Sequence, residues 1–127
     1  MSMRSANDSA AVVRNEVAGG VALFRSLADP TRLAIIRRLS TGEARVVDLT
    51  AELGLAQSTV SSHLACLRDC RLVDYRPEGR ASVYYLTHVE LMDVLQAAEA
   101  LLDATGHAVV LCPNYGAGAA RRETTGE

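Results

Sequence analysis

Apolar residues recur every three or four positions through most of this chain, which is the spacing of an amphipathic helix. Four such stretches cover about 11–28, 29–41, 46–53 and 57–70, and a wider apolar stripe covers 88–104. Asp29 and Pro30 form a typical helix start, because Asp caps free backbone N–H groups and Pro fits the first turn. The pattern predicts a mainly α-helical chain.

Two of the predicted helices are joined by a very short connection. The first ends at Gly54, and Leu55-Ala56 leads directly into the next, which begins at Gln57. Helices joined by such a Gly-containing turn form a helix-turn-helix. The second of them has a narrow apolar stripe that we expect to face the core: Val60, Leu64 and Leu67.

Beyond Cys70 the apolar period changes from helical to alternating. Leu72–Tyr75 and Ser82–Leu86 are predicted strands, and the Pro and Gly of the connector 76–81 predict a hairpin with a longer loop. A hairpin in this place is a wing. The predicted fold class is therefore mainly α with a β-hairpin, a winged helix-turn-helix with extra N- and C-terminal helices.

Length and composition predict one domain that a second copy completes. A chain of 127 residues with 4% aromatic residues and no Trp has a lean, aliphatic core. The wide stripe of the last helix is expected to face a partner subunit, so we expect a dimeric protein. The expected divisions are a disordered N-terminus over 1–10, the winged helix-turn-helix and dimerisation domain over 11–112, and a flexible C-terminal tail over 113–127.

The charge balance limits how this chain could meet nucleic acid. All thirteen basic residues are Arg, and the net charge is −2, so any positive surface must be local. No apolar run has the length of a membrane span, and no signal peptide precedes the first helix, so we expect no membrane partner and a cytoplasmic protein. In that compartment the three cysteines are expected to be reduced thiols.

Small polar residues crowd the first half of the helix that begins at Gln57. A recognition helix places such groups against base edges and phosphates in the major groove. A solvated helix face is the alternative, but Ser and Thr are weak helix formers, which favours a use beyond solubility. Gln57 can pair with adenine through two hydrogen bonds, and Arg80 at the wing tip suits a phosphate or the minor groove. The predicted DNA-binding residues are Gln57, Ser58, Thr59, Ser61, Ser62, His63 and Arg80.

The same helix carries Cys66 and Cys70, one turn apart on one face. Two thiolates in that arrangement can share a metal ion, whereas the geometry of a disulfide is strict. Cys112 lies beyond the last helix and could close over the pair. Three thiolates favour soft ions over Mg²⁺ or Ca²⁺. His63 is a candidate fourth ligand, and the alternative for each cysteine is simple packing.

Several motifs together resemble one family of bacterial repressors. The segments are Leu27–Leu33 (LADPTRL), Val60–Leu64 (VSSHL), Leu67-Arg68, Leu72-Val73 and Gly79-Arg80 with Tyr84-Tyr85. Their joint spacing resembles the arsenic- and zinc-responsive (ArsR/SmtB) repressors from about Val21 to Leu102. The resemblance implies a homodimer that binds an inverted-repeat operator and releases it when metal binds. One departure is Ala56, where many members have a Ser that caps the recognition helix.

The cysteines narrow the resemblance to a subgroup. Family members that sense arsenic through the third helix have cysteines there, but 43–49 has none here; the paired ligands of the zinc-type site on the last helix are also missing. Cys66-Leu67-Arg68-Asp69-Cys70 with Cys112 resembles the cadmium/lead sensors of the CmtR-like subgroup. That resemblance implies Cys66, Cys70 and Cys112 as metal ligands, with the tail cysteine supplied by the other protomer.

The expected function is a metal-responsive repressor that Cd(II) or Pb(II) releases from DNA, with Zn(II) or As(III) as further candidate inducers. One alternative is an As(III)/Sb(III) sensor that uses the same cysteines, and another is a thiol redox sensor in which Cys112 forms a disulfide. An enzyme is not expected, because the sequence has no Cys-x-x-Cys, nucleophile–base motif or phosphate loop. A purely structural dimerisation module would leave the polar helix and the wing unexplained.

Overall fold

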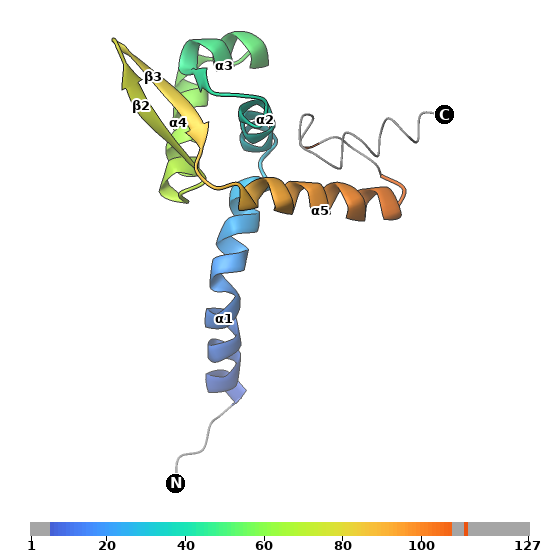
Figure 1. Ribbon diagram of the computed structural model, residues 1–127. Helices are drawn as coiled ribbons and strands as arrows, with labels where there is room; N and C mark the ends of the chain where they lie inside the picture. Colours follow the sequence, from blue (N-terminus) through green and yellow to red (C-terminus); the bar gives the residue numbers. More distant parts are fainter. Residues whose placement is uncertain (1–5, 108–110, 112–127) are drawn as a thin grey trace.

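Two long helices extend from a small winged body (Figure 1). The computed structural model describes residues 6–107 and 111. The elements in chain order are α1 (Ala6–Leu27), α2 (Pro30–Leu39), β1 (Ala44–Arg45), α3 (Val46–Leu53), α4 (Gln57–Asp69), β2 (Val73–Glu78), β3 (Ala81–Leu86) and α5 (Glu90–Ala104). The predicted fold class, a winged helix-turn-helix with an extra helix at each end, is confirmed.

The first helix is longer than the apolar pattern predicted. It begins at Ala6 and not near Ala11, so 6–10 belongs to α1 and the expected disorder over 1–10 is wrong for these residues. Gly19 and Gly20 lie inside α1, and no other described atom lies within 4 Å of a Cβ built at either position.

The start of α2 is as predicted. Oδ1 of Asp29 accepts hydrogen bonds from the backbone N–H groups of Thr31 (2.8 Å) and Arg32 (3.0 Å), and Pro30 occupies the first turn. These N–H groups, the Arg32 amide first, stabilise the charged carboxylate and lower the pKa of Asp29 below its ordinary value of 3.8. The cap therefore stabilises the fold more strongly when Asp29 is ionised.

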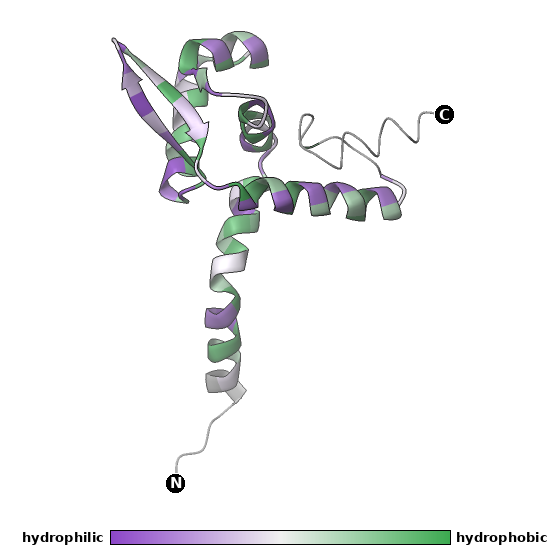
Figure 2. Ribbon diagram, viewed as in Figure 1, coloured by the Kyte–Doolittle hydropathy of each residue, from purple (hydrophilic) through white to green (hydrophobic). Residues whose placement is uncertain are grey.

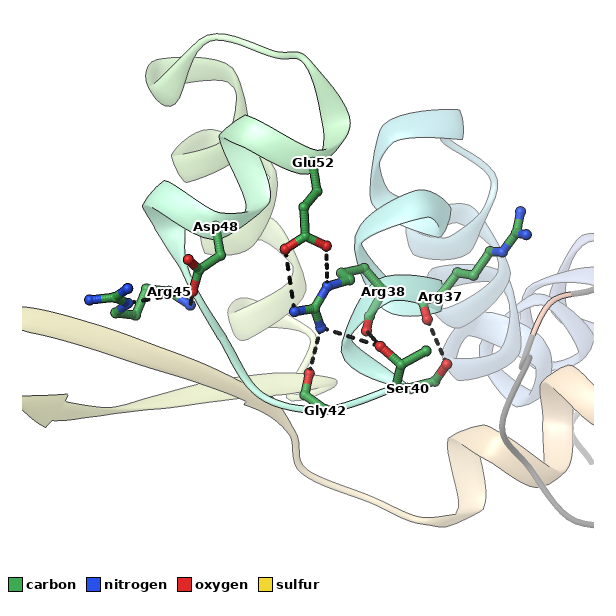
Figure 3. A network of polar contacts seen from close by, with 8 residues as sticks. Arg37, Arg38, Ser40, Gly42, Arg45, Asp48 and Glu52 are labelled. Carbon is green, nitrogen blue, oxygen red and sulfur yellow. Dashed lines mark hydrogen bonds and ion pairs between the residues drawn. The ribbon is translucent and has the colours of Figure 1, made fainter.

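Arg38 of α2 binds both the loop that precedes α3 and a residue of α3 itself (Figure 3). Nε of Arg38 lies 2.5 Å from Oε1 of Glu52 on α3, and Nη1 donates to the carbonyl oxygen of Gly42 at 3.0 Å. Further along, Asp48 accepts from the backbone N–H of Arg45 at 3.0 Å, which caps α3. These contacts join α2, the connecting loop and α3 on the surface.

The wing is a tighter hairpin than predicted. β2 and β3 pair from Val73↔Leu86 to Glu78↔Ala81, so Gly79 and Arg80 alone make the turn and the predicted longer loop is wrong. Gly79 has a φ of 65°, which a side chain would strain. Pro77 is tolerated inside β2 because β2 lies at the edge of the β1-β3-β2 sheet. The two-residue β1 gave no periodic signal in the sequence.

The core lies where α2, α3, α4, the wing and the start of α5 meet. Its fully buried members are aliphatic, as the composition predicted: Ile35, Ile36, Leu49, Val60, Leu64, Leu67 and Val73. On α5, the acidic residue Glu99 is only 3% exposed, and Met92 is buried beside the predicted stripe. Across the described part of the chain, no helix has both the length and the apolar character needed to cross a membrane.

Candidate DNA-reading helix and thiol site

The reading helix is held by the stripe that the sequence predicted. Val60, Leu64 and Leu67 on α4 are each 0% exposed and pack into the core. At the end of α3, Gly54 adopts a φ of 68°, and its N–H donates to the carbonyl of Thr50 at 2.9 Å. This left-handed cap reverses the chain within three residues. As a result the first turns of α4 stand at the surface beside the wing (Figure 1).

The predicted DNA-binding residues of α4 lie together at its first two turns. Gln57, Ser58, Ser61 and Ser62 are exposed, and Thr59 is half-buried. Ala56 is the N-cap, with no side-chain hydrogen bond to the first turn, so the departure at this position leaves the helix without a side-chain cap. The backbone N–H groups there are available to water or to an anionic oxygen.

His63 lies apart from the rest of this polar group. Its side chain is 22% exposed, and Nδ1 lies 4.0 Å from Oδ1 of Asp29, the carboxylate that caps α2. The imidazole therefore links α4 to the start of α2. It is absent from the residues that line the thiol pocket described below, which gives no support to a role as fourth metal ligand.

The wing presents one arginine that no other described residue pairs. Arg80 is exposed at the turn between β2 and β3. Arg76 is instead held by Glu43, with nitrogen–oxygen distances of 2.7 and 2.8 Å, and these bonds lower the pKa of Glu43. Arg76 is thus neutralised by a carboxylate, whereas the charge of Arg80 stays open at the turn.

The last turn of α4 is surrounded by other elements. The helix ends in a Schellman motif: the N–H of Leu72 donates to the carbonyl of Leu67 (3.0 Å), and that of Arg71 to Arg68 (2.9 Å). Arg71 has a φ of 63°, where glycine is usual. Arg68 pairs with Asp74 at 3.1 Å and lies 4.6 Å above the ring of Tyr75. The sequence did not predict these contacts between α4 and the wing.

Both helix thiols open into one pocket. The backbone N–H of Cys70 donates to the carbonyl of Cys66 at 3.1 Å, which places the side chains one turn apart, and both residues are exposed free thiols. They line a pocket of about 350 Å³ with Ala22, Arg25, Ser26, Arg32 and Asp69. Two accessible sulfurs at this spacing fit a soft cation.

Ser26 is a contact of this site that the sequence analysis missed. It is 8% exposed, and its Oγ lies 2.7 Å from Sγ of Cys70, 44 residues away in sequence. The available signal was a small polar residue directly before Leu27, which packs against the core as Leu23 does. An inward polar residue in such a place needs a hydrogen-bond partner.

The predicted third thiol, Cys112, lies outside the described residues. Within 6–107 and 111, no three His, Cys, Asp or Glu side chains come together as a metal site. The residue just before Cys112 is held: the N–H of Leu111 donates to Oε2 of the buried Glu99 at 2.5 Å, and its side chain packs against the core. The described structure therefore supplies two of the three predicted ligands.

Comparison with known proteins identifies the family. Residues 29–75, from the start of α2 into β2, match the model of the bacterial regulatory proteins of the arsR family. A probable mercury resistance operon repressor from Streptomyces lividans is 34% identical over 89 residues, which cover 70% of this chain and 71% of that protein. This chain belongs to the ArsR family.

Two further relatives bear on the choice of ligand. The regulator CmtR from Mycobacterium tuberculosis is 47% identical over 73 residues, 58% of this chain and 62% of CmtR. Its solved structure, described as a cadmium metal-sensor, aligns with a TM-score of 0.53 and 44% identity over 61% of this chain and 80% of that chain. An arsenical resistance operon repressor from Staphylococcus aureus is 36% identical over 74 residues, 58% of this chain and 71% of that protein.

Membership of the ArsR family confirms two predictions. The helix-turn-helix and its wing are those of a transcriptional repressor, and the matching proteins are regulators, so the prediction of a regulator and not an enzyme is confirmed. The matched segment includes all of α4 with Cys66 and Cys70, but neither α1 nor α5.

Proposed function

We propose that this protein represses transcription as a homodimer bound to an inverted-repeat operator, and that Cd(II) or Pb(II) releases it. The ligands would be Cys66, Cys70 and Cys112. The observation that carries the proposal is the position of two exposed thiols, one turn apart, at the end of the reading helix itself. The similarity to a protein described as a cadmium metal-sensor supports the choice of metal.

The proposed DNA contacts come from α4 and the wing. Gln57 would read a base edge, and the hydroxyls of Ser58, Thr59, Ser61 and Ser62 would meet base edges or phosphates. The first N–H groups of α4 lack a side-chain cap, so a phosphate oxygen can accept from them. His63 would approach the backbone beside Asp29, and Arg80 would bind a phosphate or enter the minor groove.

The proposed dimer uses the apolar face of α1. Val13, Val17, Val21 and Phe24 are 45–64% exposed. Figure 2 shows hydrophobic segments, in green, along this projecting helix. Leu101 on α5 is 66% exposed as well. A single chain gains nothing by exposing these side chains, whereas a second copy would bury them.

Two neighbouring glycines provide a test of this interface. Gly20 lies beside Val17, Val21 and Phe24 in an apolar groove, whereas Gly19 is not among the residues that line it. Gly20→Ala should weaken dimerisation, measured by sedimentation equilibrium, if a partner helix approaches closely there. Gly19→Ala is the matched control and should leave the dimer intact. Equal effects of the two substitutions would contradict this interface.

The metal response follows from where the ligands are attached. Cys66 and Cys70 would bind the ion as thiolates, and a third sulfur would tie the end of α4 to the C-terminal segment. When bound, the ion supplies a link between parts of the protein that are otherwise separate. By linkage, operator DNA must weaken metal binding by the same factor by which metal weakens operator binding.

The deciding experiment follows operator binding as metal is added. A fluorescent DNA fragment from upstream of the protein's own coding sequence is bound and titrated separately with Cd(II), Pb(II), Zn(II) and As(III). We expect Cd(II) and Pb(II) to release the DNA and to produce sulfur-to-metal charge-transfer absorption. Cys112→Ser should remove the release, and normal release by this variant would contradict the third ligand.

Two alternatives are separated by the same assay. An As(III)/Sb(III) sensor would respond to those ions first, and the similarity to an arsenical resistance operon repressor supports this candidate. A thiol redox sensor would release DNA on addition of peroxide without metal. We place the protein in the cytoplasm, where thiols stay reduced and available to either chemistry.

A further inference from the structure

Ser26 joins α1 to the sensing end of α4, and the inference drawn from it rests on the proposed function. Residues 11–22 of α1 are all exposed, so the helix is held to the body mainly near its C-terminal end. There Oγ of Ser26, itself buried, lies 2.7 Å from Sγ of Cys70. One side chain of α1 thus touches one of the proposed metal ligands.

The Ser26 hydroxyl makes a second contact. Oγ of Ser26 also lies 2.9 Å from the carbonyl oxygen of Ala22, one turn earlier. A carbonyl can only accept, so Ser26 is the donor in that hydrogen bond. One buried oxygen thus contacts both the backbone of α1 and the sulfur of Cys70.

The backbone at Ser26 is held as well. Nε of Arg32 on α2 donates to the carbonyl oxygen of Ser26 at 2.8 Å, and Nη2 donates to that of Arg25 at 3.2 Å. The end of α1 is therefore fastened to α2 through the backbone and to α4 through the Ser26 side chain. Of these two attachments, only the one to α4 involves a proposed metal ligand.

We propose that Ser26 is a positioning residue: it holds the Cys70 sulfur beside α1 in the metal-free repressor and relays the ligation of that sulfur to α1. A metal ion bound to the Cys70 sulfur competes with Ser26 for that sulfur. The contact between Oγ of Ser26 and Sγ of Cys70 must then rearrange or break. Either response alters the last turns of α1, whose other face carries Val21 and Phe24 of the proposed dimer surface.

The test compares Ser26→Ala with the wild type and with a matched control. Ser40→Ala is the control, because Oγ of Ser40 also donates to a backbone carbonyl (Arg37, 2.6 Å) but contacts no thiol among the described residues. In the metal-free protein, alkylation of Cys70 is compared with that of Cys66 in the same molecule by mass spectrometry. Ser26→Ala should raise the Cys70/Cys66 ratio severalfold, and Ser40→Ala should leave it unchanged.

The relay itself is measured by amide hydrogen exchange and by operator binding. Addition of Cd(II) to the wild type should change exchange in peptides covering 22–28, and Ser26→Ala should lose that change. The factor by which Cd(II) weakens operator binding should fall about fivefold or more in Ser26→Ala, the lower end of ordinary allosteric coupling. Ser26→Thr, which keeps a hydroxyl, should retain both responses.

The outcomes separate this inference from the proposed function. If Ser26→Ala has wild-type alkylation, exchange and coupling while the wild type binds Cd(II) and releases DNA, the role of Ser26 is refuted and the proposed function stands. If the wild type itself shows neither charge-transfer absorption nor release of DNA with Cd(II) or with Pb(II), both are refuted. Should Ser26→Ala fail to fold by circular dichroism, Ser26→Gly removes the hydroxyl in its place, and Ser26→Thr remains the variant that keeps it.

Discussion

The two ends of α4 differ in what surrounds them. At the first end, Gln57, Ser58, Ser61 and Ser62 are exposed and the helix has no side-chain cap. At the other end, Arg68 pairs with Asp74 of the wing, Cys70 contacts Ser26 of α1, and a Schellman motif closes the helix. One rigid helix thus has a free end and an attached end.

This difference fits the two roles that we propose for the ends of α4. A surface that reads DNA must be open to the major groove, so its polar groups cannot be used up by contacts within the protein. A site that regulates must change contacts within the protein when it is occupied, because a ligand shifts an equilibrium only through differential interactions. Since α4 is continuous from Gln57 to Asp69, a displacement at the attached end moves the reading end.

The largest expected effect is a loss of fold stability, which would disrupt both ends of α4. Leu64 is 0% exposed and lies between them, so Leu64→Ala should lower the free energy of unfolding by about 2–5 kcal/mol. Urea denaturation followed by circular dichroism measures this loss. Ser61→Ala, on the exposed side of the same helix, should change it by less than about 0.5 kcal/mol. Comparable losses would contradict the buried stripe.

Substitution at the attached end should weaken metal binding and leave metal-free operator binding nearly unchanged. Cys66→Ser should reduce Cd(II) affinity at least about 100-fold, since even loss of an outer-shell partner of a metal ligand costs up to that much. Competition with a coloured chelator measures the affinity. Operator binding without metal should stay within about twofold of the wild type. Unchanged Cd(II) affinity would show that the helix thiols are not ligands.

Substitution at the free end should weaken DNA binding and leave metal affinity unchanged. Gln57→Ala should weaken operator binding by about 1–3 kcal/mol if its side chain makes a bidentate base contact, with little change on unrelated DNA. Arg80→Ala should instead weaken binding to the operator and to unrelated DNA alike. It should also reduce the slope of log K against log salt concentration by about one, as expected for one lost phosphate contact. Fluorescence anisotropy at several salt concentrations distinguishes these results. Identical profiles for both variants would argue against a base contact by Gln57.

The missing cap at the free end can be restored. Ala56→Ser should supply an acceptor for the first turn of α4 and stabilise the protein by about 1 kcal/mol. If the same N–H groups bind a phosphate in the operator complex, the serine competes with the DNA, and affinity should fall slightly while stability rises. A thermal melt and an operator titration on one preparation test both effects. No gain in stability would mean that water already satisfies this helix end fully.

The smallest expected effect is on protein stability at low pH, through Asp29, the N-cap of α2. The pKa of Asp29 is lowered in the fold, so its stabilising effect is complete above the unfolded value near 3.8 and disappears as pH falls through the lower folded value. Asn also caps helices but does not titrate. Asp29→Asn should therefore reduce the loss of stability below about pH 4 in urea melts. An unchanged acid profile would assign that loss to other carboxylates, such as Asp48.

The sequence was informative wherever a signal is local. The caps at Asp29 and Gly54, the stripe of Val60, Leu64 and Leu67, and the bounds of α3 were all correct, because each depends on spacing within a few residues. The hairpin turn was wrong because Pro77 normally interrupts a strand, and only its place at the sheet edge makes it acceptable. The burial of Glu99 also depends on a distant residue, Leu111.

By itself, the sequence determined that this protein has a winged helix-turn-helix with a polar reading helix that ends in two same-face thiols. Periodicity and spacing are enough for that, because one helix sets the relation between Gln57, Cys66 and Cys70. Only the tertiary structure decided what stands next to those thiols. Ser26 and Cys70 are 44 residues apart, and no local pattern predicts that they meet. Their contact arises from the packing of α1 against the body, where burial of Leu23 and Leu27 places an inward hydroxyl against the end of α4.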